Sequence, residues 1–145
     1  RRTVRISYQF QVNESTNLIF TASRAFHEGD QIPAKVLPSK QACYISHNGL
    51  EHFKPNFELL SGAGFTWVGS SNGHVPDGAV LAGHQRTGEP LYVGRAHHEG
   101  SLTVGKIHTG HGCIYIPYGG QEISILHYEV LVAQQRGMME CCQCQ

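Results

Sequence analysis

The sequence lacks an excess of charge of either sign, because its 145 residues hold 11 Lys and Arg against 11 Asp and Glu. Domains that bind nucleic acid usually carry a clear basic excess, so this balance argues against a nucleic-acid partner. Charged residues make up only 15% of the chain, which also holds 17 glycines, whereas soluble domains average about 25% charged residues and about 7% glycine. Little charge and much glycine favour short strands and tight turns over helices with salt-bridged faces.

Long apolar runs are also missing. No stretch approaches the ~18 residues that predict a membrane-spanning helix, so we expect no membrane span. No apolar signal core follows Arg1, which predicts a processed or trimmed start and leaves cytoplasmic and secreted locations both open. The chain carries no P-loop, Rossmann fingerprint or GxSxG elbow, and we therefore predict that it is not an enzyme.

Cysteines are few and odd in number. Five cysteines cannot all pair within one chain. Cys43 and Cys113 lie in apolar runs, where a free thiol behaves as a small hydrophobic side chain. Cys141, Cys142 and Cys144 lie in a C-terminal tail, residues 133–145, which we expect to be flexible. Metal binding and cross-linking of chains both remain open for these three thiols.

What the sequence does have is an internal repeat. Shifted by 71 residues, residues 17–60 align without a gap on residues 88–131, with 12 identities in 44 positions. Ordinary composition would give about three identities. Charged residues are among the matches, including Lys35 with Lys106. We therefore predict two copies of one unit, in residues 1–61 and 62–132.

The sequence pattern of the repeat predicts β-strands. Residues 4–12 and 124–132 alternate apolar and polar side chains, and residues 91–93 and 113–116 are apolar runs of strand length. Asn-Gly, Asp-Gly and Gly-Gly dipeptides separate these runs as turns. The pattern predicts an all-β fold, an antiparallel sandwich or barrel. The first copy lacks the segment that carries Trp67 in the second. Either another segment, such as the one after Leu131, fills this place, or an uncovered edge favours self-association or exchange of strands between copies.

The second copy resembles the DM9 repeat, and the resemblance covers residues 4–132. The matching segments carry Trp67 and the runs HVPDGAV (74–80), LYVGRA (91–96), GSLTVGKI (100–107), IPYGGQE (116–122) and YEVL (128–131). Small two-repeat DM9 proteins of invertebrates include a mannose-specific lectin of oyster. The resemblance implies an all-β lectin that binds mannose-type glycans, as a homodimer and in innate immune recognition, without a cofactor.

The family's sugar site implies specific residues here. A carboxylate ten residues before the Arg of the ArgAla pair and the lysine of the GlyLys motif hold the sugar in the family's lectin. In the first copy these positions are Glu14 and Lys35, and in the second they are Gln85 and Lys106. Tyr118, which we expect to be exposed beside a Gly-Gly turn, is a candidate for stacking on the sugar ring.

Carboxylate and ammonium suit this task chemically. A carboxylate accepts two neighbouring hydroxyls in charge-assisted bonds, and an ammonium donates to their oxygens. Gln85 in place of the acid predicts a weaker second site. Two alternatives stay open: Glu14 and Lys35 form an ordinary surface ion pair, or the chain is a non-catalytic interaction or targeting module of a larger protein, for example a natterin-like pore-forming one.

Other repeated charges are interpreted as structural. We expect pairing within each repeat among these residues: Arg24 with Glu28 and Glu51 in the first copy, Arg95 with Glu99 and Glu122 in the second. Glu58 and Glu129 are likewise interpreted as structural.

Ten histidines raise the question of a metal. His97 and His98, and His108 with His111 and Cys113, have suitable ligand chemistry. Their spacing matches no established four-ligand pattern, so we predict no metal site.

Overall fold

The computed structural model describes residues 6–7, 22–37, 40, 42–60 and 64–133. Within these ranges there are strands, a 3₁₀ turn at Thr109–His111 and no α-helix, which confirms the all-β prediction. None of the described segments is a helix with the length and apolar character needed to cross a membrane. The strands are β1 (Ile6–Ser7), β2 (Ala22–His27), β3 (Asp30–Leu37), β4 (Ala42–His47), β5 (Leu50–Lys54), β6 (Glu58–Leu60), β7 (Phe65–Ser71), β8 (Leu81–His84), β9 (Pro90–His98), β10 (Ser101–His108), β11 (Cys113–Tyr118), β12 (Gln121–Ile125) and β13 (His127–Ala133).

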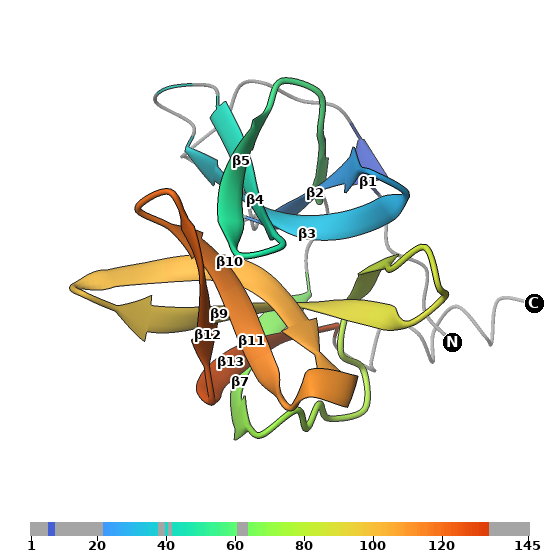
Figure 1. Ribbon diagram of the computed structural model, residues 1–145. Helices are drawn as coiled ribbons and strands as arrows, with labels where there is room; N and C mark the ends of the chain where they lie inside the picture. The colour runs from blue at the N-terminus through green and yellow to red at the C-terminus, as the bar shows by residue number, and fades with distance from the viewer. Residues whose placement is uncertain (1–5, 8–21, 38–39, 41, 61–63, 134–145) are drawn as a thin grey trace, which may run out of the picture.

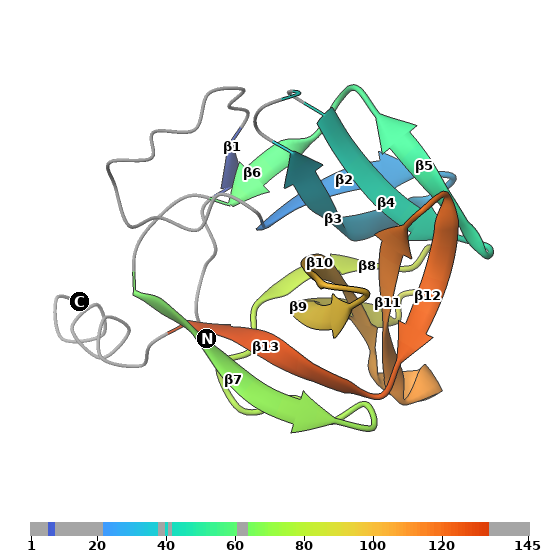
Figure 2. The same ribbon diagram turned by 90° about the vertical axis from the view of Figure 1, so that its left-hand side faces the viewer.

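Eight of these strands close into an antiparallel barrel. Its order is β3-β4-β5-β12-β11-β10-β9-β8, and β8 returns to β3. The first repeat supplies the strands drawn from blue to green in Figure 1, and the second supplies those from light green to red. Figure 2 shows β5 and β12 meeting where the two repeats join, and their pairing there is Gln121 with Leu50. The barrel is therefore built jointly by both halves of the chain.

Strand bounds repeat with the sequence offset. Adding 71 to the bounds of β3, β4 and β5 gives those of β10, β11 and β12. The alternating residues 124–132 differ from expectation, because the chain breaks at Leu126 into β12 and β13. Of the alternating N-terminal segment, residues 4–12, only β1 lies within the described residues, where Ile6 pairs with Leu60 of β6.

The core follows the same symmetry. One buried cluster belongs to the first repeat except for Leu91, one belongs to the second, and a third contains residues of both. Six members of the first cluster have their counterparts 71 residues on in the cluster of the second: Ala25/Ala96, Val36/Ile107, Cys43/Ile114, Ile45/Ile116, Phe57/Tyr128 and Leu59/Val130. In the shared cluster, Leu60 and Leu131 are such a pair. Burial of these side chains joins the repeats into one domain.

Two local features explain how the strands turn and close. Asn48 and Gly49, with φ of 52° and 84°, form a left-handed hairpin turn of the kind that Asn-Gly favours. Glu28 and Glu99 occupy the same left-handed region, with φ of 50° and 48°, although it is unfavourable for glutamate. Gly83 lets β8 approach β3, because a side chain there would overlap the carbonyl oxygen of Gln31.

Candidate functional site

Lys35, a predicted sugar ligand, lies on β3 at the junction between the repeats. Its Nζ is 3.0 Å from Oε2 of Glu51 and donates a hydrogen bond of 2.7 Å to the carbonyl oxygen of Pro117, in the other repeat. Oε1 of Glu51 in turn accepts from the N–H of Gly120 at 2.7 Å. A buried charge must be paired and hydrogen-bonded to be tolerated, and this arrangement satisfies both groups.

Lys106, in the second repeat, makes the equivalent contacts to its own repeat's glutamate and to the backbone of the first repeat. Its Nζ is 3.1 Å from Oε2 of Glu122 and donates to the carbonyl oxygen of Ser46 at 2.8 Å. Oε1 of Glu122 accepts from the N–H of Gly49 at 2.9 Å. We call these two reciprocal Lys–Glu pairs, with their backbone partners, the clasp. Each repeat thus contributes one lysine and one glutamate whose side chains hydrogen-bond to backbone groups of the other repeat.

The clasp has electrostatic consequences. Burial alone would raise the pKa of Glu122, but the N–H of Gly49 and the ammonium of Lys106 outweigh it and hold that pKa below its ordinary value. The side chain of Lys106 is 6% exposed and that of Lys35 is 16% exposed. An ammonium has three N–H donors, and two of them are used in each lysine. The remaining donor is therefore more accessible at Lys35.

Tyr118 lies beside Lys35, so the structure brings two predicted site residues together. The ring centroid of Tyr118 is 5.8 Å from Nζ of Lys35. Tyr118 is half-buried rather than exposed as expected, because its ring packs against His98 with centroids 4.9 Å apart. Glu14, the predicted acid partner, lies outside the described residues, so its distance from Lys35 stays a prediction.

Gln85 lies in a polar hollow of about 220 Å³, lined by Glu28, Asp30, His47, Asn48, Gln85, Arg86 and Thr87. The hollow is shared by the two repeats, since Oδ1 of Asp30 accepts from the N–H of Arg86 at 2.9 Å. Lys106 does not line it. Its ammonium contacts Ser46, the residue before His47. The structure therefore places the half-buried Gln85 in the lining of this hollow, whereas Lys106 is not part of that lining.

Arg24 and Arg95, which occupy equivalent positions in the two repeats, pair differently from the prediction. Nε of Arg24 is 2.8 Å from Oε1 of Glu58, and Nε of Arg95 is 2.6 Å from Oε1 of Glu129. Pairing within each repeat and a structural role for Glu58 and Glu129 are as expected. The predicted partners are wrong: Glu28 and Glu99 contact histidines, and the clasp lysines hold Glu51 and Glu122.

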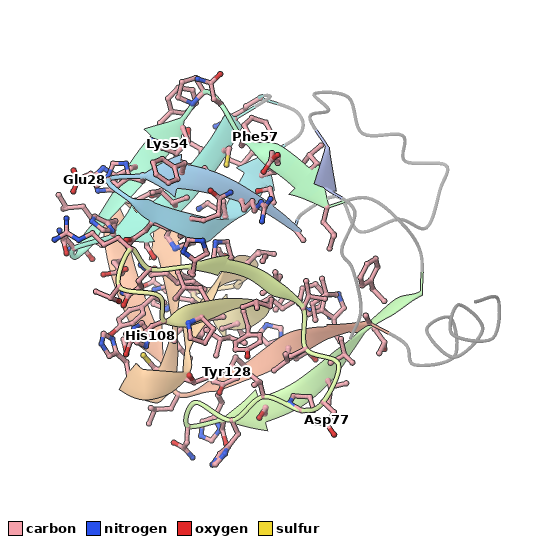
Figure 3. All side chains as sticks on the ribbon, turned by 90° about the vertical axis from the view of Figure 1, so that its right-hand side faces the viewer. Glu28, Lys54, Phe57, Asp77, His108 and Tyr128 are labelled. Carbon is pink, nitrogen blue, oxygen red and sulfur yellow. The ribbon has the colours of Figure 1, made fainter. Side chains whose placement is uncertain are left out.

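A cluster that sequence reasoning missed lies at the tip of the β2–β3 hairpin. Three potential ligand atoms lie within 4.8 Å of one another there, one each from His27, Glu28 and His47. Figure 3 labels Glu28 at the hairpin tip and Lys54, the last residue of β5. Burial, followed by the charges of Lys54, His52 and His47, lowers the pKa of His27, so its imidazole is neutral at pH 7. The recurrence of His27 as His98 in the second repeat was visible in the sequence, but the approach of His47 to His27 was not.

The histidines that the sequence did single out are arranged for packing. The rings of His108 and His111 stack with centroids 3.6 Å apart. Nδ1 of His108 accepts the N–H of His111 and caps the 3₁₀ turn. Burial, with a smaller effect of His111, lowers the pKa of His108. Cys43 and Cys113 are buried free thiols, as expected, whereas the three cysteines of the tail lie outside the described residues.

Comparison with known proteins gives three findings. The family model described as the DM9 repeat matches residues 14–125. Natterin-3 of Thalassophryne nattereri is 36% identical over 78 residues, which are 54% of this chain and 18% of that protein. The chain thus matches less than a fifth of that relative's length.

The crystal structure of the nematode sperm cell motility protein MFP2B superimposes with a TM-score of 0.58 over 79% of this chain and 37% of that chain. The sequence identity is 13%. This likeness shows a shared β-fold and nothing of function.

Proposed function

Because the chain belongs to the DM9 repeat family, we propose that it is a non-catalytic carbohydrate-binding module for mannose-type glycans, acting in innate immune recognition. The principal site is formed by Glu14, Lys35 and Tyr118, and a weaker one by Gln85 and Lys106. A homodimer would present several such sites to a glycan surface and gain affinity through effective concentration.

The observation that carries the proposal is the placement of Lys35. Its ammonium is held in one position by Glu51 and Pro117 and keeps a third N–H without a partner in those contacts. A pre-positioned donor loses little conformational entropy when a hydroxyl oxygen binds. The ring of Tyr118 lies within 5.8 Å of the same ammonium and offers an apolar face beside a polar group, as one face of a pyranose requires.

The second position supports weaker binding. The polar hollow, about 220 Å³, is smaller than the roughly 300–1,000 Å³ of sites for drug-sized ligands, so it suits a single small polar ring. Gln85 forms neutral hydrogen bonds, which are about half as strong as those of a carboxylate. Lys106 is nearly inaccessible, at 6% side-chain exposure. We therefore assign the main affinity to the first site.

Titration calorimetry of the full chain with methyl α-mannopyranoside tests this. Hydrogen bonds to charged groups contribute about 1.5–3 kcal/mol, so Glu14→Gln weakens binding about tenfold to a hundredfold. Gln85→Ala, the matched change in the second copy, leaves most of the affinity. Gln85→Glu supplies the missing acid and strengthens the second site. Absence of mannoside binding by a folded chain, or equal losses in Glu14→Gln and Gln85→Ala, would contradict the proposal.

One observation favours a second candidate, a targeting or interaction module of a longer protein. The match to Natterin-3 covers 18% of that protein, so a related segment there forms part of a larger chain. A glycan array separates the two functions. Silence of the folded chain across mannose-terminated glycans, together with retention of a protein partner in a pull-down, favours the second.

A further inference from the structure

Three potential metal ligands meet where β2 and β4 end. His27 is the last residue of β2, Glu28 begins the turn that follows, and His47 is the last residue of β4. Nε2 of His27 is 3.6 Å from Oε2 of Glu28, and Nε2 of His47 is 3.4 Å from Oε1 of the same carboxylate. The carboxylate therefore lies between the two imidazoles.

Two imidazoles and one carboxylate form a donor set that binds divalent transition metals. Zn²⁺ takes two His and one Glu with a fourth position left open, at ligand distances of roughly 2.0–2.2 Å. Tetrahedral ligands at such distances lie about 3.3–3.6 Å from one another. The two carboxylate–imidazole contacts, at 3.4 and 3.6 Å, match that spacing but involve the two different oxygens of Glu28. Taking one ligand atom from each residue, the three lie within 4.8 Å of one another, so they must draw closer together around an ion.

The histidine nitrogens are available to a ligand. Nε2 of His27 is enclosed by protein and makes no hydrogen bond within the described part of the chain. An enclosed polar atom without a partner is costly, and a bound ion would remove that cost. Nδ1 of His47 faces Oδ2 of Asp30 at 3.7 Å. A carboxylate behind a ligating imidazole orients the ring and raises its basicity.

The site is open on one side. The side chain of Glu28 is 65% exposed, and Glu28, Asp30 and His47 all line the polar hollow. An ion can therefore enter from solvent, and the hollow leaves room for water or another small ligand at the fourth position.

One neighbouring side chain opposes binding. Nζ of Lys54 is 3.2 Å from Nδ1 of His27. An ammonium that donates to Nδ1 fixes the neutral imidazole with its proton on Nε2, the nitrogen that would ligate. Lys54 must therefore turn away before the ion binds.

The second repeat lacks the complete set and serves as an internal control. His98 and Glu99 recur there, with Nε2 and Oε2 3.7 Å apart. Tyr118 stands where the first repeat has His47, and Ser101 stands where it has Asp30. The ring of Tyr118 packs on His98 with centroids 4.9 Å apart, the same separation as between His27 and His47. The equivalent position of the second repeat thus has the same ring arrangement but lacks one of the metal-ligand donors.

We propose that His27, Glu28 and His47 bind one divalent transition-metal ion, Zn²⁺ in preference, with Asp30 as the positioning residue behind His47. The site belongs to the first repeat alone and does not depend on glycan binding. Its test therefore uses metal without sugar, and its failure leaves the glycan proposal untouched.

The test is calorimetric titration with ZnCl₂ and visible spectroscopy with Co²⁺, on the full chain with its tail thiols removed by Cys141→Ser, Cys142→Ser and Cys144→Ser. One ion binds per chain at this site. Glu28→Asn abolishes a ligand and weakens Zn²⁺ binding at least tenfold. Glu99→Asn is the matched control, because both changes place Asn in the same left-handed turn position, and it leaves Zn²⁺ affinity unchanged.

Two further variants test the geometry. His47→Tyr installs the residue that the second repeat carries and removes the ion, together with the visible absorption of bound Co²⁺. Lys54→Met removes the competing donor and tightens binding. Equal affinities in Glu28→Asn and the parent, or equal losses in Glu28→Asn and Glu99→Asn, overturn the proposal in favour of adventitious binding by surface histidines.

Discussion

The clasp predicts a large and pH-dependent loss of stability when Lys106 is replaced. In Lys106→Met the aliphatic stem is retained and the ammonium is lost. The carboxylate of Glu122, at 11% exposure, then has no cation, and the carbonyl of Ser46 loses its donor. Removal of one partner from a buried pair costs about 3–5 kcal/mol. Domains of this size are stable by about 5–15 kcal/mol, so the variant should still fold.

The loss should shrink as the pH falls. In the parent chain the pKa of Glu122 lies below its ordinary value. Its contribution to stability is therefore complete above the unfolded-state pKa, about 4.3, and is lost as the pH falls through the lower folded-state value. In Lys106→Met the ammonium no longer opposes the effect of burial, so the pKa of Glu122 rises. Protonation then relieves the variant at pH 4 but not at pH 7.

Urea unfolding of the parent and of Lys106→Met at pH 7 and pH 4 measures how the loss of stability depends on pH. Lys35→Met is the matched control for the other half of the clasp, and because Lys35 is more exposed its cost should lie toward the lower end of that range. Replacement of both Lys106 and Glu122 by Met should cost less than Lys106→Met alone. A loss below about 1 kcal/mol, or one that is equal at both pH values, would refute the reasoning.

Three further perturbations follow from described contacts. His108→Asn keeps an acceptor for the 3₁₀ turn but cannot titrate. Because the pKa of His108 is lowered in the folded chain, the parent loses stability as the pH falls below about 6.5. The melting temperature of the variant should therefore fall less steeply with pH in thermal melts from pH 7.5 to 5. Burial raises the pKa of Cys43 to about 12, so a thiol reagent at pH 8 should modify it only in urea, and rapid labelling of the native chain would contradict its burial. Arg95→Lys removes a guanidinium that lies 4.1 Å over the ring of Trp67 and should cost about 1 kcal/mol with a change in tryptophan fluorescence; an unchanged spectrum would count against the stacking.

Periodicity and internal repetition predicted much of the fold. The offset of 71 residues follows from local sequence similarity, and the bounds of β3 and β10 differ by the same amount. The arginine partners were also within reach, because Arg24 to Glu58 and Arg95 to Glu129 are both separations of 34 residues. Their strands pair directly, so a repeated long-range spacing of opposite charges was the available signal.

The clasp could not be predicted from sequence because it depends on how the repeats dock. Lys35 and Lys106 were identified as equivalent residues, but their backbone acceptors lie 82 and 60 residues away along the chain. The cluster at the β2–β3 turn was missed for a similar reason. His27 and Glu28 are adjacent, whereas His47 reaches them only because β3 pairs with both β2 and β4.

The most direct test of glycan recognition is a crystal structure of the full chain soaked with mannose. The account predicts density for one sugar against Lys35 and Tyr118, with the carboxylate of Glu14 accepting neighbouring hydroxyls. Density for the sugar elsewhere, or a Glu14 carboxylate on a different surface from the Lys35 ammonium, would contradict it.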